Sequence, residues 1–366
     1  MKRLALLLGS LLVVTAAASA KEVVPAPVVV EEAPVQIVEK EVIVYRDKEE
    51  GFRPNGFVDL QYRYYGQTES QDTLWGSNNN ASRTQLEGKI QMTEKQALDF
   101  RVRDYNSLDH AGILGKDAAG KETRGNVGGT QTRLRYYYNH GLVGDSKVDM
   151  TSFVKYEKNG DQSLEYQLKF QLADYLFDND FVKTTNFEVG PRYIYSWGSG
   201  NDSDYTNTLG LYLDWINQLP WGFSTEVEID GLHYNIYGKN AEKVDGKETN
   251  LKDDSFDLSV AAKILHNYNL YTNGAYSVDW AFEGGYDTYK WSSLDQFVPV
   301  KGSKYEDSTY ELYAQPSLTL SYQATDFVTL YGTLGAEYRN WNFITQSEAQ
   351  DWRWQPYAIV GFRTTF

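Results

Sequence analysis

The sequence of 366 residues contains no cysteine and only three methionines. Disulfides, thiolate metal sites and cysteine nucleophiles are therefore excluded, and a chain without thiols suits export through an oxidising compartment. Residues 21–366 also lack an apolar run long enough for a transmembrane helix, which needs ~20 residues. The mean hydropathy of −0.54 and a charged fraction of 23% would by themselves indicate a water-soluble protein.

Positive charge is scarce as well. The chain has 35 lysines and arginines against 50 aspartates and glutamates, for a net charge of −15. Binding to nucleic-acid phosphates requires a basic face, so we expect no nucleic-acid partner.

Histidine is rare, and this limits the possible enzymes. The four histidines are His110, His140, His233 and His266. Only His233, with Asp230 or Asp257, offers a conceivable catalytic pair, and a surface histidine without a catalytic role is the simpler interpretation. We predict a protein that is not an enzyme and has no cofactor and no metal site.

The N-terminus has the layout of a secretory signal peptide. Lys2 and Arg3 are basic, residues 4–14 are apolar, and small residues lead to Ala20. This apolar run is too short to span a bilayer, so we predict cleavage between Ala20 and Lys21. Residues 21–50 are rich in Pro, Val and Glu and predict an extended periplasmic tether. Valines between residues 35 and 45 are compatible with a short coiled coil, and equally with strand.

In the last segment, Arg353–Phe366, two sets of side chains of different polarity alternate strictly. One set of side chains runs from Trp354 to Phe366 and is apolar, with aromatic residues at both ends. The other set is polar or small and includes Arg353 and Arg363. Aromatic residues at both ends of an apolar face are typical of a strand that crosses an outer membrane. The 29 tyrosines of the chain fit the same interpretation, because tyrosine suits a membrane interface.

Similar alternation recurs along residues 51–366 and predicts an all-β fold, a transmembrane antiparallel β-barrel of about 14 strands. The expected strands are 58–64, 86–92, 98–103, 133–138, 148–154, 164–172, 187–197, 209–215, 223–230, 256–264, 278–287, 311–322, 328–339 and 353–366. Gly-, Asn-, Asp- and Ser-rich stretches predict long external connections at 68–81, 107–130, 238–254 and 291–307. Short internal turns are expected at 93–96, 140–146, 217–221 and 323–327. The connections near 158–162 and 198–204 are short for external loops, and those near 174–184 and 265–275 are long for internal turns.

The interior of such a barrel must be wet. A barrel of about 14 strands is wider than side chains can fill, and the tether is too short to plug it. A large soluble β-sandwich is the competing fold, but it would mix aromatic residues through a dry core instead of placing them at strand ends.

The inward charges fall into two groups. We expect a basic wall on the first four and last two barrel strands and an acidic wall opposite. The basic residues are Arg63, Arg83, Arg101, Arg103, Arg133, Arg135, Arg339, Arg353 and Arg363, and the acidic residues are Glu226, Glu228, Asp230, Asp257, Asp279, Glu283 and Glu311. The alternative is that these charges keep the lumen wet or pair with neighbours on the same wall.

The whole chain resembles the fusobacterial major outer-membrane porins, the FomA family. The matching stretches run from end to end: residues 4–13, 42–47, 53–56, 283–289, 310–313, 316–318, 324–328 and 352–356. The resemblance implies a trimeric, voltage-sensitive, weakly selective diffusion channel for ions and small hydrophilic solutes in the outer membrane of a Gram-negative bacterium.

The resemblance also implies partners. They are outer-membrane lipid and lipopolysaccharide, and host or bacterial surface ligands on external loops. Phe366 resembles the C-terminal signal that the barrel-assembly machinery reads. Two functions remain open beside the diffusion channel. One is a non-conducting adhesin that acts through its external loops, and the other is a substrate-specific channel.

Overall fold

The computed structural model describes residues 51–67, 80–107, 113–116, 122–124, 130–159, 161–198, 204–245, 248–293, 297–300, 304–307, 312–340 and 352–366. Residues 51–366 form one compact unit. The predicted signal cleavage at Ala20 and Lys21 and the predicted tether at 21–50 lie outside the described residues. No helix in the described ranges is long and apolar enough to cross a membrane.

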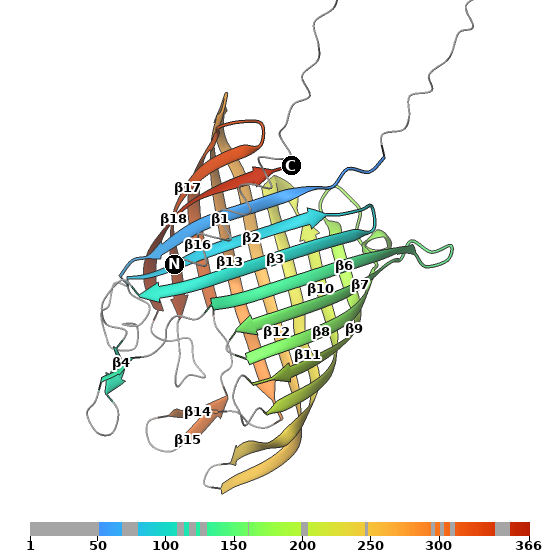
Figure 1. The fold of residues 1–366 in the computed structure, drawn as a ribbon, viewed down its shortest axis with the longest axis vertical. Helices are drawn as coiled ribbons and strands as arrows, with labels where there is room; N and C mark the ends of the chain where they lie inside the picture. The colour runs from blue at the N-terminus through green and yellow to red at the C-terminus, as the bar shows by residue number, and fades with distance from the viewer. Residues whose placement is uncertain are drawn as a thin grey trace, which may run out of the picture. The chain divides into compact units, whose positions relative to one another are not determined.

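Fourteen antiparallel strands close into a barrel (Figure 1). Their order around the barrel is β1-β18-β17-β16-β13-β12-β11-β10-β9-β8-β7-β6-β3-β2. The bounds are β1 Asn55–Tyr65, β2 Ala81–Gln91, β3 Gln96–Ser107, β6 Thr130–Leu142, β7 Asp149–Asn159, β8 Asp161–Gln171, β9 Lys183–Trp197, β10 Tyr205–Gln218, β11 Phe223–Asp245, β12 Glu248–Asn273, β13 Tyr276–Ser292, β16 Leu312–Gln323, β17 Val328–Asn340 and β18 Trp352–Thr365. The predicted fold class and strand number are confirmed.

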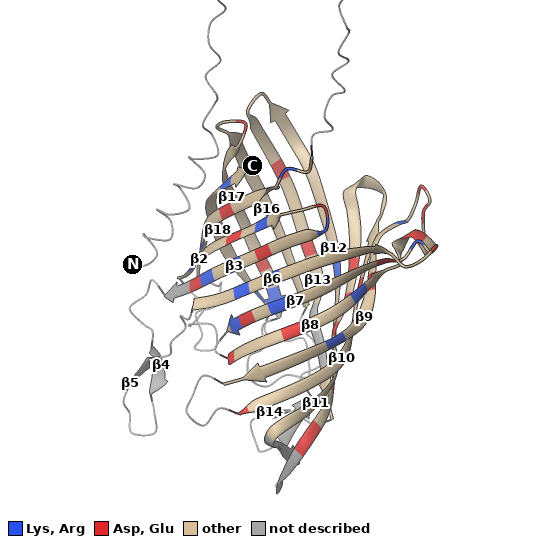
Figure 2. Ribbon diagram, turned by 45° about the vertical axis from the view of Figure 1, so that its right-hand side comes forward, with Lys and Arg blue, Asp and Glu red and all other residues tan. Residues whose placement is uncertain are grey.

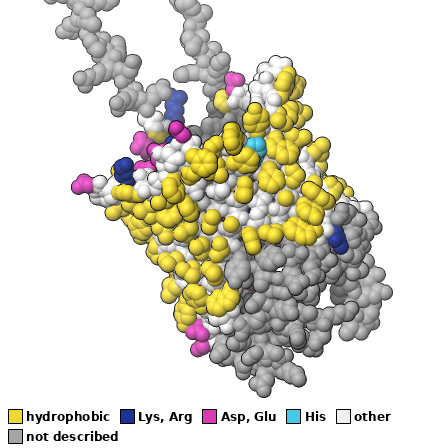
Figure 3. Space-filling view, turned by 180° about the vertical axis from the view of Figure 1, so that it is seen from behind, with side chains coloured by type: hydrophobic (Ala, Val, Ile, Leu, Met, Phe, Trp, Pro, Cys, Tyr) yellow, Lys and Arg dark blue, Asp and Glu magenta, His cyan; other side chains and the backbone are white. Residues whose placement is uncertain are grey.

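The alternation in sequence becomes an alternation between the two faces of the barrel wall. On β8, Leu164 and Tyr166 are 48% and 47% exposed, whereas Glu165 and Gln167 between them are 1% and 3% exposed. Leu334 on β17 is exposed in the same way as Leu164. Figure 3 shows the result on one face of the molecule, where hydrophobic side chains are spread over much of the described surface.

This apolar outer surface determines where the protein resides. Lipid offers no hydrogen bonds to the backbone, so a sheet can cross a membrane only when it closes on itself. A closed, even-numbered antiparallel barrel with an outward apolar band is the architecture of bacterial outer-membrane proteins. The chain is therefore placed in the outer membrane.

The barrel closes between its first and last strands. Val58 pairs with Thr364, and Tyr65 pairs with Tyr357, in an unbroken antiparallel register. Beyond the end of β18, Phe366 exchanges backbone hydrogen bonds of 3.0 and 3.1 Å with Gly56. The C-terminal residue thus takes part in the closure.

Two predicted connections are wrong. Strands β11 and β12 continue to Asp245 and from Glu248, so most of the expected loop at 238–254 is a strand hairpin, with a register shift between Ile236 and Ala241. Strand β12 also runs on to Asn273, and the expected long turn at 265–275 shrinks to a tight turn before Tyr276. The apolar alternation of the sequence ends near Ile236 and Ile264, whereas the backbone ladder continues beyond them, so hydropathy alone could not show these extensions.

The remaining connections agree with the expected pattern more closely. Predicted loop 107–130 carries the short hairpin β4 (Ile113–Lys116) and β5 (Glu122–Arg124), and loop 291–307 carries β14 (Phe297–Val300) and β15 (Lys304–Asp307). The long internal connection near 174–184 includes the 3-10 helix η2 (Ala173–Tyr175), and η3 (Pro220–Gly222) forms the turn before β11.

Candidate functional site

The predicted basic residues lie on strands that are consecutive around the barrel. Arg339 is on β17, Arg353 and Arg363 on β18, Arg63 on β1, Arg83 on β2, Arg101 and Arg103 on β3, and Arg133 and Arg135 on β6. We call this group of strands the basic wall. The register pairs Arg63 with Arg83, Arg101 with Arg133, and Arg339 with Arg353, so arginines face arginines across neighbouring strands.

The predicted acidic residues lie across the barrel. Glu226, Glu228 and Asp230 are on β11, Asp257 on β12, and Asp279 and Glu283 on β13, and we call these strands the acidic wall. Strands β3 and β12 are seven positions apart in the ring of fourteen. Figure 2 shows acidic and basic positions distributed over the strands of the barrel. Glu311 lies outside the described residues.

Carboxylates on the basic wall neutralise part of its charge. Arg133 lies 3.4 Å from Asp99, and Arg101 lies 4.0 Å from Glu157 on the adjoining strand β7. Arg339 Nε donates to Glu337 at 2.9 Å, and Arg363 Nε donates to Asp59 at 3.0 Å. Pairing within one wall, the alternative left open by the sequence, therefore occurs at these positions.

The acidic wall contains a cation as well. Lys263 on β12 lies 2.9 Å from Glu226 and 4.0 Å from Glu228. Asp257 accepts hydrogen bonds from Asn235, Ser255 and Ser292. Glu283 accepts from Tyr313 at 2.5 Å, and Asp279 accepts from Asn269 at 2.7 Å and from Ser277 at 3.0 Å. Asp257, Asp279 and Glu283 are thus held by neutral donors, so their charge is not cancelled.

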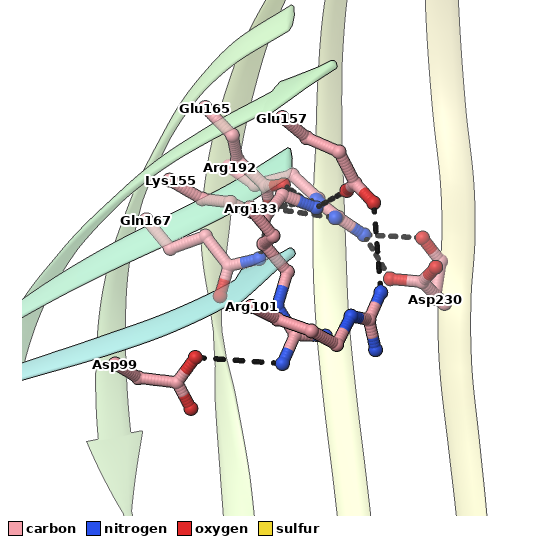
Figure 4. Close-up of polar contacts among 9 residues, drawn as sticks. All are labelled: Asp99, Arg101, Arg133, Lys155, Glu157, Glu165, Gln167, Arg192 and Asp230. Atoms are coloured by element: carbon pink, nitrogen blue, oxygen red, sulfur yellow. Dashed lines mark hydrogen bonds and ion pairs between the residues drawn. The ribbon is translucent and has the colours of Figure 1, made fainter. Parts of the chain in front are cut away.

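A third group of charges connects the two walls, and sequence reasoning missed it. Glu165 on β8 lies 2.6 Å from Lys155 on β7 and 2.6 Å from Arg192 on β9 (Figure 4). Two inward positions further along β8, Lys169 lies 2.8 Å from Glu188 on β9. Glu165 and Arg192 are 1% and 5% exposed, so this is the most buried ion pair described in the barrel wall.

Arg192 continues the chain of charges toward the acidic wall. Its guanidinium contacts the Asp230 carboxylate at 2.8 Å and also donates to the Asp230 carbonyl oxygen. Strand β10 lies between β9 and β11, and the residue that pairs with Arg192 there is Gly210. A Cβ at Gly210 would stand 2.6 Å from His233 and 3.4 Å from Arg192 Cγ, so glycine leaves room for the arginine to cross.

A bulge completes this contact. The β11–β12 register shifts between Ile229 and Gly231, which leaves Asp230 unpaired in the ladder and free to turn toward Arg192. Arg192 lies on the inward set of β9, between the outward residues Pro191 and Tyr193, and this placement is the signal that sequence reasoning could have used. The bulge at Asp230 has no such signal.

Aromatic rings support several inward cations. Lys169 Nζ lies 5.1 Å from the Phe153 ring and 4.7 Å from the Tyr212 ring, and Arg63 lies 4.8 Å from the Tyr357 ring. Phe153 and Tyr357 are 5% and 7% exposed. These contacts fix the direction of long side chains along the wall.

The histidines do not assemble a catalytic group among the described residues. His233 points inward opposite Gly210 and Asp257 in the register, but its Nε2 has no hydrogen-bond partner there. On the outer face, His140 Nε2 lies 2.8 Å from Ser152 Oγ, and Tyr166 lies 3.3 Å from the same oxygen. No carboxylate contacts the imidazole in the described part of the chain, so this contact lacks the orienting group of a triad. The described residues also contain no group of three or more metal-ligating side chains.

No protein-family model matches the chain, and no curated protein sequence matches it. The chain is similar to several solved barrels at low identity. A bacterial polysaccharide outer-membrane secretin is 10% identical, with 85% of this chain and 98% of that chain covered and a TM-score of 0.37. The outer-membrane protein OprD from Pseudomonas aeruginosa is 9% identical (87% and 96% covered, TM-score 0.31), and an anion-selective porin from Comamonas acidovorans is 10% identical (86% and 99% covered, TM-score 0.33). These scores are low, so the description of the fold depends on the chain's own geometry.

Proposed function

We propose that the protein is a non-enzymatic outer-membrane channel whose water-filled lumen admits ions and small hydrophilic solutes. One observation carries the proposal: polar and charged side chains occupy the inward positions of a closed barrel of fourteen strands. Side chains fill a barrel of about eight strands, and the interior widens with strand number. Water must therefore solvate the remaining inward charges.

The two walls give the proposed channel a transverse field. Cationic solutes are drawn toward β11, β12 and β13, and anionic solutes toward β17, β18, β1, β2, β3 and β6, so the channel is weakly selective and does not exclude either sign. Rings and rows of charge set selectivity in other pores by the same electrostatics. The pairs within each wall weaken the field and keep the selectivity modest.

The test is ionic conductance of the purified barrel in planar bilayers. We expect stepwise current increments, and reversal of charge at Arg101, Arg103 and Arg133 to glutamate should shift the reversal potential toward cation preference. Reversal at Glu228 and Glu283 to lysine should shift it the opposite way. An intact barrel, shown by heat-modifiable gel mobility, that carries no current would support the adhesin function instead. An unchanged reversal potential in both variants would overturn the two-wall selectivity.

The remaining expectations from the sequence stay predictions. They comprise signal cleavage after Ala20, a periplasmic tether, a homotrimer, recognition of Phe366 by the barrel-assembly machinery, contact with lipopolysaccharide, and adhesive partners on external loops. The pairing of Phe366 with Gly56 supports a role for this residue in closure, because it holds the chain end against β1.

A further inference from the structure

Three guanidinium groups on adjacent strands of the basic wall have fewer acceptors than they can use. Arg101 on β3 is the register partner of Arg133 on β6, and Arg135 follows two residues later. Arg101 and Arg133 are 16% and 14% exposed, so both remain open to solvent on the inner side. We call these three residues the arginine cluster.

The contacts of the cluster leave donors unused. Within the described ranges Arg101 makes one ion pair, to Glu157 at 4.0 Å, which is longer than a hydrogen bond. Arg133 contacts Asp99 at 3.4 Å, and Arg135 shares a side-chain hydrogen bond with Tyr137. The Nε atoms of both arginines are buried without a hydrogen-bond partner. An arginine carries five N–H donors, so the cluster has many more donors than described acceptors.

The neighbouring carboxylates are already engaged. Glu87, the register partner of Arg101, accepts a hydrogen bond from Gln85 at 2.7 Å. Asp99, the register partner of Arg135, contacts Arg133. Glu157 also contacts Lys155 at 3.4 Å, and Lys155 contacts Glu165, which binds Arg192. Lys155 is moreover the register partner of Arg135, so a further cation borders the cluster. Like charges at such spacing repel strongly in a partly buried site. An anion from solution would relieve the repulsion and satisfy the free donors.

We propose that Arg101, Arg133 and Arg135 form an oxyanion-binding subsite on the lumen wall, for small solutes that carry a phosphate or carboxylate group. This inference rests on the proposed channel, because the subsite must be reached through water. A guanidinium presents paired N–H groups that match two oxygens of one oxyanion, and lysine cannot reproduce this fork. The subsite should therefore bind phosphate and carboxylate more tightly than chloride, and more tightly than a wall of the same total charge without the arginine forks would.

The experiment compares phosphate binding with conduction in the full-length mature protein. Inorganic phosphate and, separately, acetate are titrated into the detergent-solubilised barrel by calorimetry and into planar bilayers held in potassium chloride. The test variant is Arg101→Lys/Arg133→Lys, which keeps the wall charge and removes the forks. The matched control is Arg339→Lys/Arg363→Lys, the same exchange at two positions of the basic wall where the arginine Nε already donates to a carboxylate.

We expect phosphate to bind the wild type and reduce its single-channel current. The concentration for half-maximal effect should rise about tenfold in the test variant, the cost of one weakened charged hydrogen bond, with reversal potential in potassium chloride unchanged. The control should behave as the wild type. If the double variant does not reach the folded gel mobility, Arg101→Lys alone replaces it.

Each contrary outcome addresses one claim. Phosphate binding without any conductance would overturn the channel and leave the subsite. Conductance without a phosphate effect would overturn the subsite and leave the channel. An equal loss in test and control variants would show that only the summed charge of the basic wall attracts the anion, which also overturns the subsite.

Discussion

Tyr331 on β17 donates a 2.7 Å hydrogen bond to Asp59 on β1, across the intervening strand β18 and between residues 272 positions apart in the sequence. The Tyr331 ring lies over Gly361, where a Cβ would stand 2.6 Å from the ring, so a side chain at this position would block the contact. Asp59 is fully buried and also accepts from Arg363 on β18. One carboxylate thus ties together the first strand and the last two.

Tyr331→Phe should weaken this closure without changing the fold. The substitution leaves Asp59 Oδ1 with its weaker contact to Gln61 at 3.5 Å, and a buried acceptor that loses a donor costs about 1–3 kcal/mol. We expect the free energy of unfolding in urea, followed by tryptophan fluorescence in phospholipid micelles, to fall by that amount. Tyr322→Phe on the outer face is the control, and an equal loss there would contradict the assignment.

Gly210→Ala should disturb the crossing of Arg192 from β9 to β11. The new methyl group would stand 2.6 Å from His233 Cδ2 and 2.7 Å from the Leu232 carbonyl oxygen. Overpacking of this kind costs about 1–3 kcal/mol. Gly332→Ala is the matched control, because its Cβ would meet only one atom, the Ile359 carbonyl oxygen at 3.9 Å. Equal unfolding free energies for the two variants would refute the steric role of Gly210.

Glu165→Gln should be the most destabilising single change among the inward carboxylates. It leaves Lys155 and the buried Arg192 without their shared partner, and the loss of one member of a buried pair costs about 3 kcal/mol. Glu188→Gln provides the comparison, because the Glu188 side chain is 26% exposed and its one ion pair within the described residues is with Lys169. We expect Glu188→Gln to lower the free energy of unfolding by less than about 1 kcal/mol, measured by the same urea titration. A reversed order would show that the Glu165 cluster is not a structural centre.

Alternation alone was enough to predict most of the barrel. The set Leu164, Tyr166, Leu168 against Glu165, Gln167, Lys169 fixes which face of β8 meets lipid, because a one-residue slip would expose every charge to hydrocarbon. The strand number followed from counting such segments. The same signal fails in the extensions of β11 and β12, where the sequence predicts loops and the structure has strands.

The candidate site was less accessible to sequence reasoning. The inward placement of the arginines on β1, β2, β3 and β6 follows from the two-residue alternation of a strand. The order of the strands follows from the hairpins that connect them. The partners do not follow: the contact of Arg192 with Asp230 depends on a bulge in β11 and on the missing side chain of Gly210. A contact between side chains on two strands that are not neighbours, such as β9 and β11, depends on the curvature of the closed barrel wall. No local sequence pattern encodes that curvature.

Leu334→Arg should test directly which face of the wall meets the acyl chains. Leu334 on β17 is 70% exposed and lies between Leu318 on β16 and Ala358 on β18 in the register, both on the apolar face. An arginine on the lipid face costs about 2–4 kcal/mol at the bilayer midplane and progressively less toward the interfaces. We expect the free energy of unfolding, measured in phospholipid vesicles, to fall by an amount in this range.

The control for that measurement is Thr329→Arg, an inward position on the same strand. The substitution removes one hydrogen bond, from the Thr329 hydroxyl to Gln323 at 2.8 Å. The new guanidinium can reach water in the lumen, so the free energy of unfolding should fall by about 1 kcal/mol. If Leu334→Arg were tolerated as well as Thr329→Arg, the apolar belt would not be embedded in lipid. The register partner of Thr329 is Arg363, so both variants are measured in high salt, which screens repulsion between the two arginines. If Thr329→Arg were still the costlier change, the inner face of the barrel would not be in contact with water.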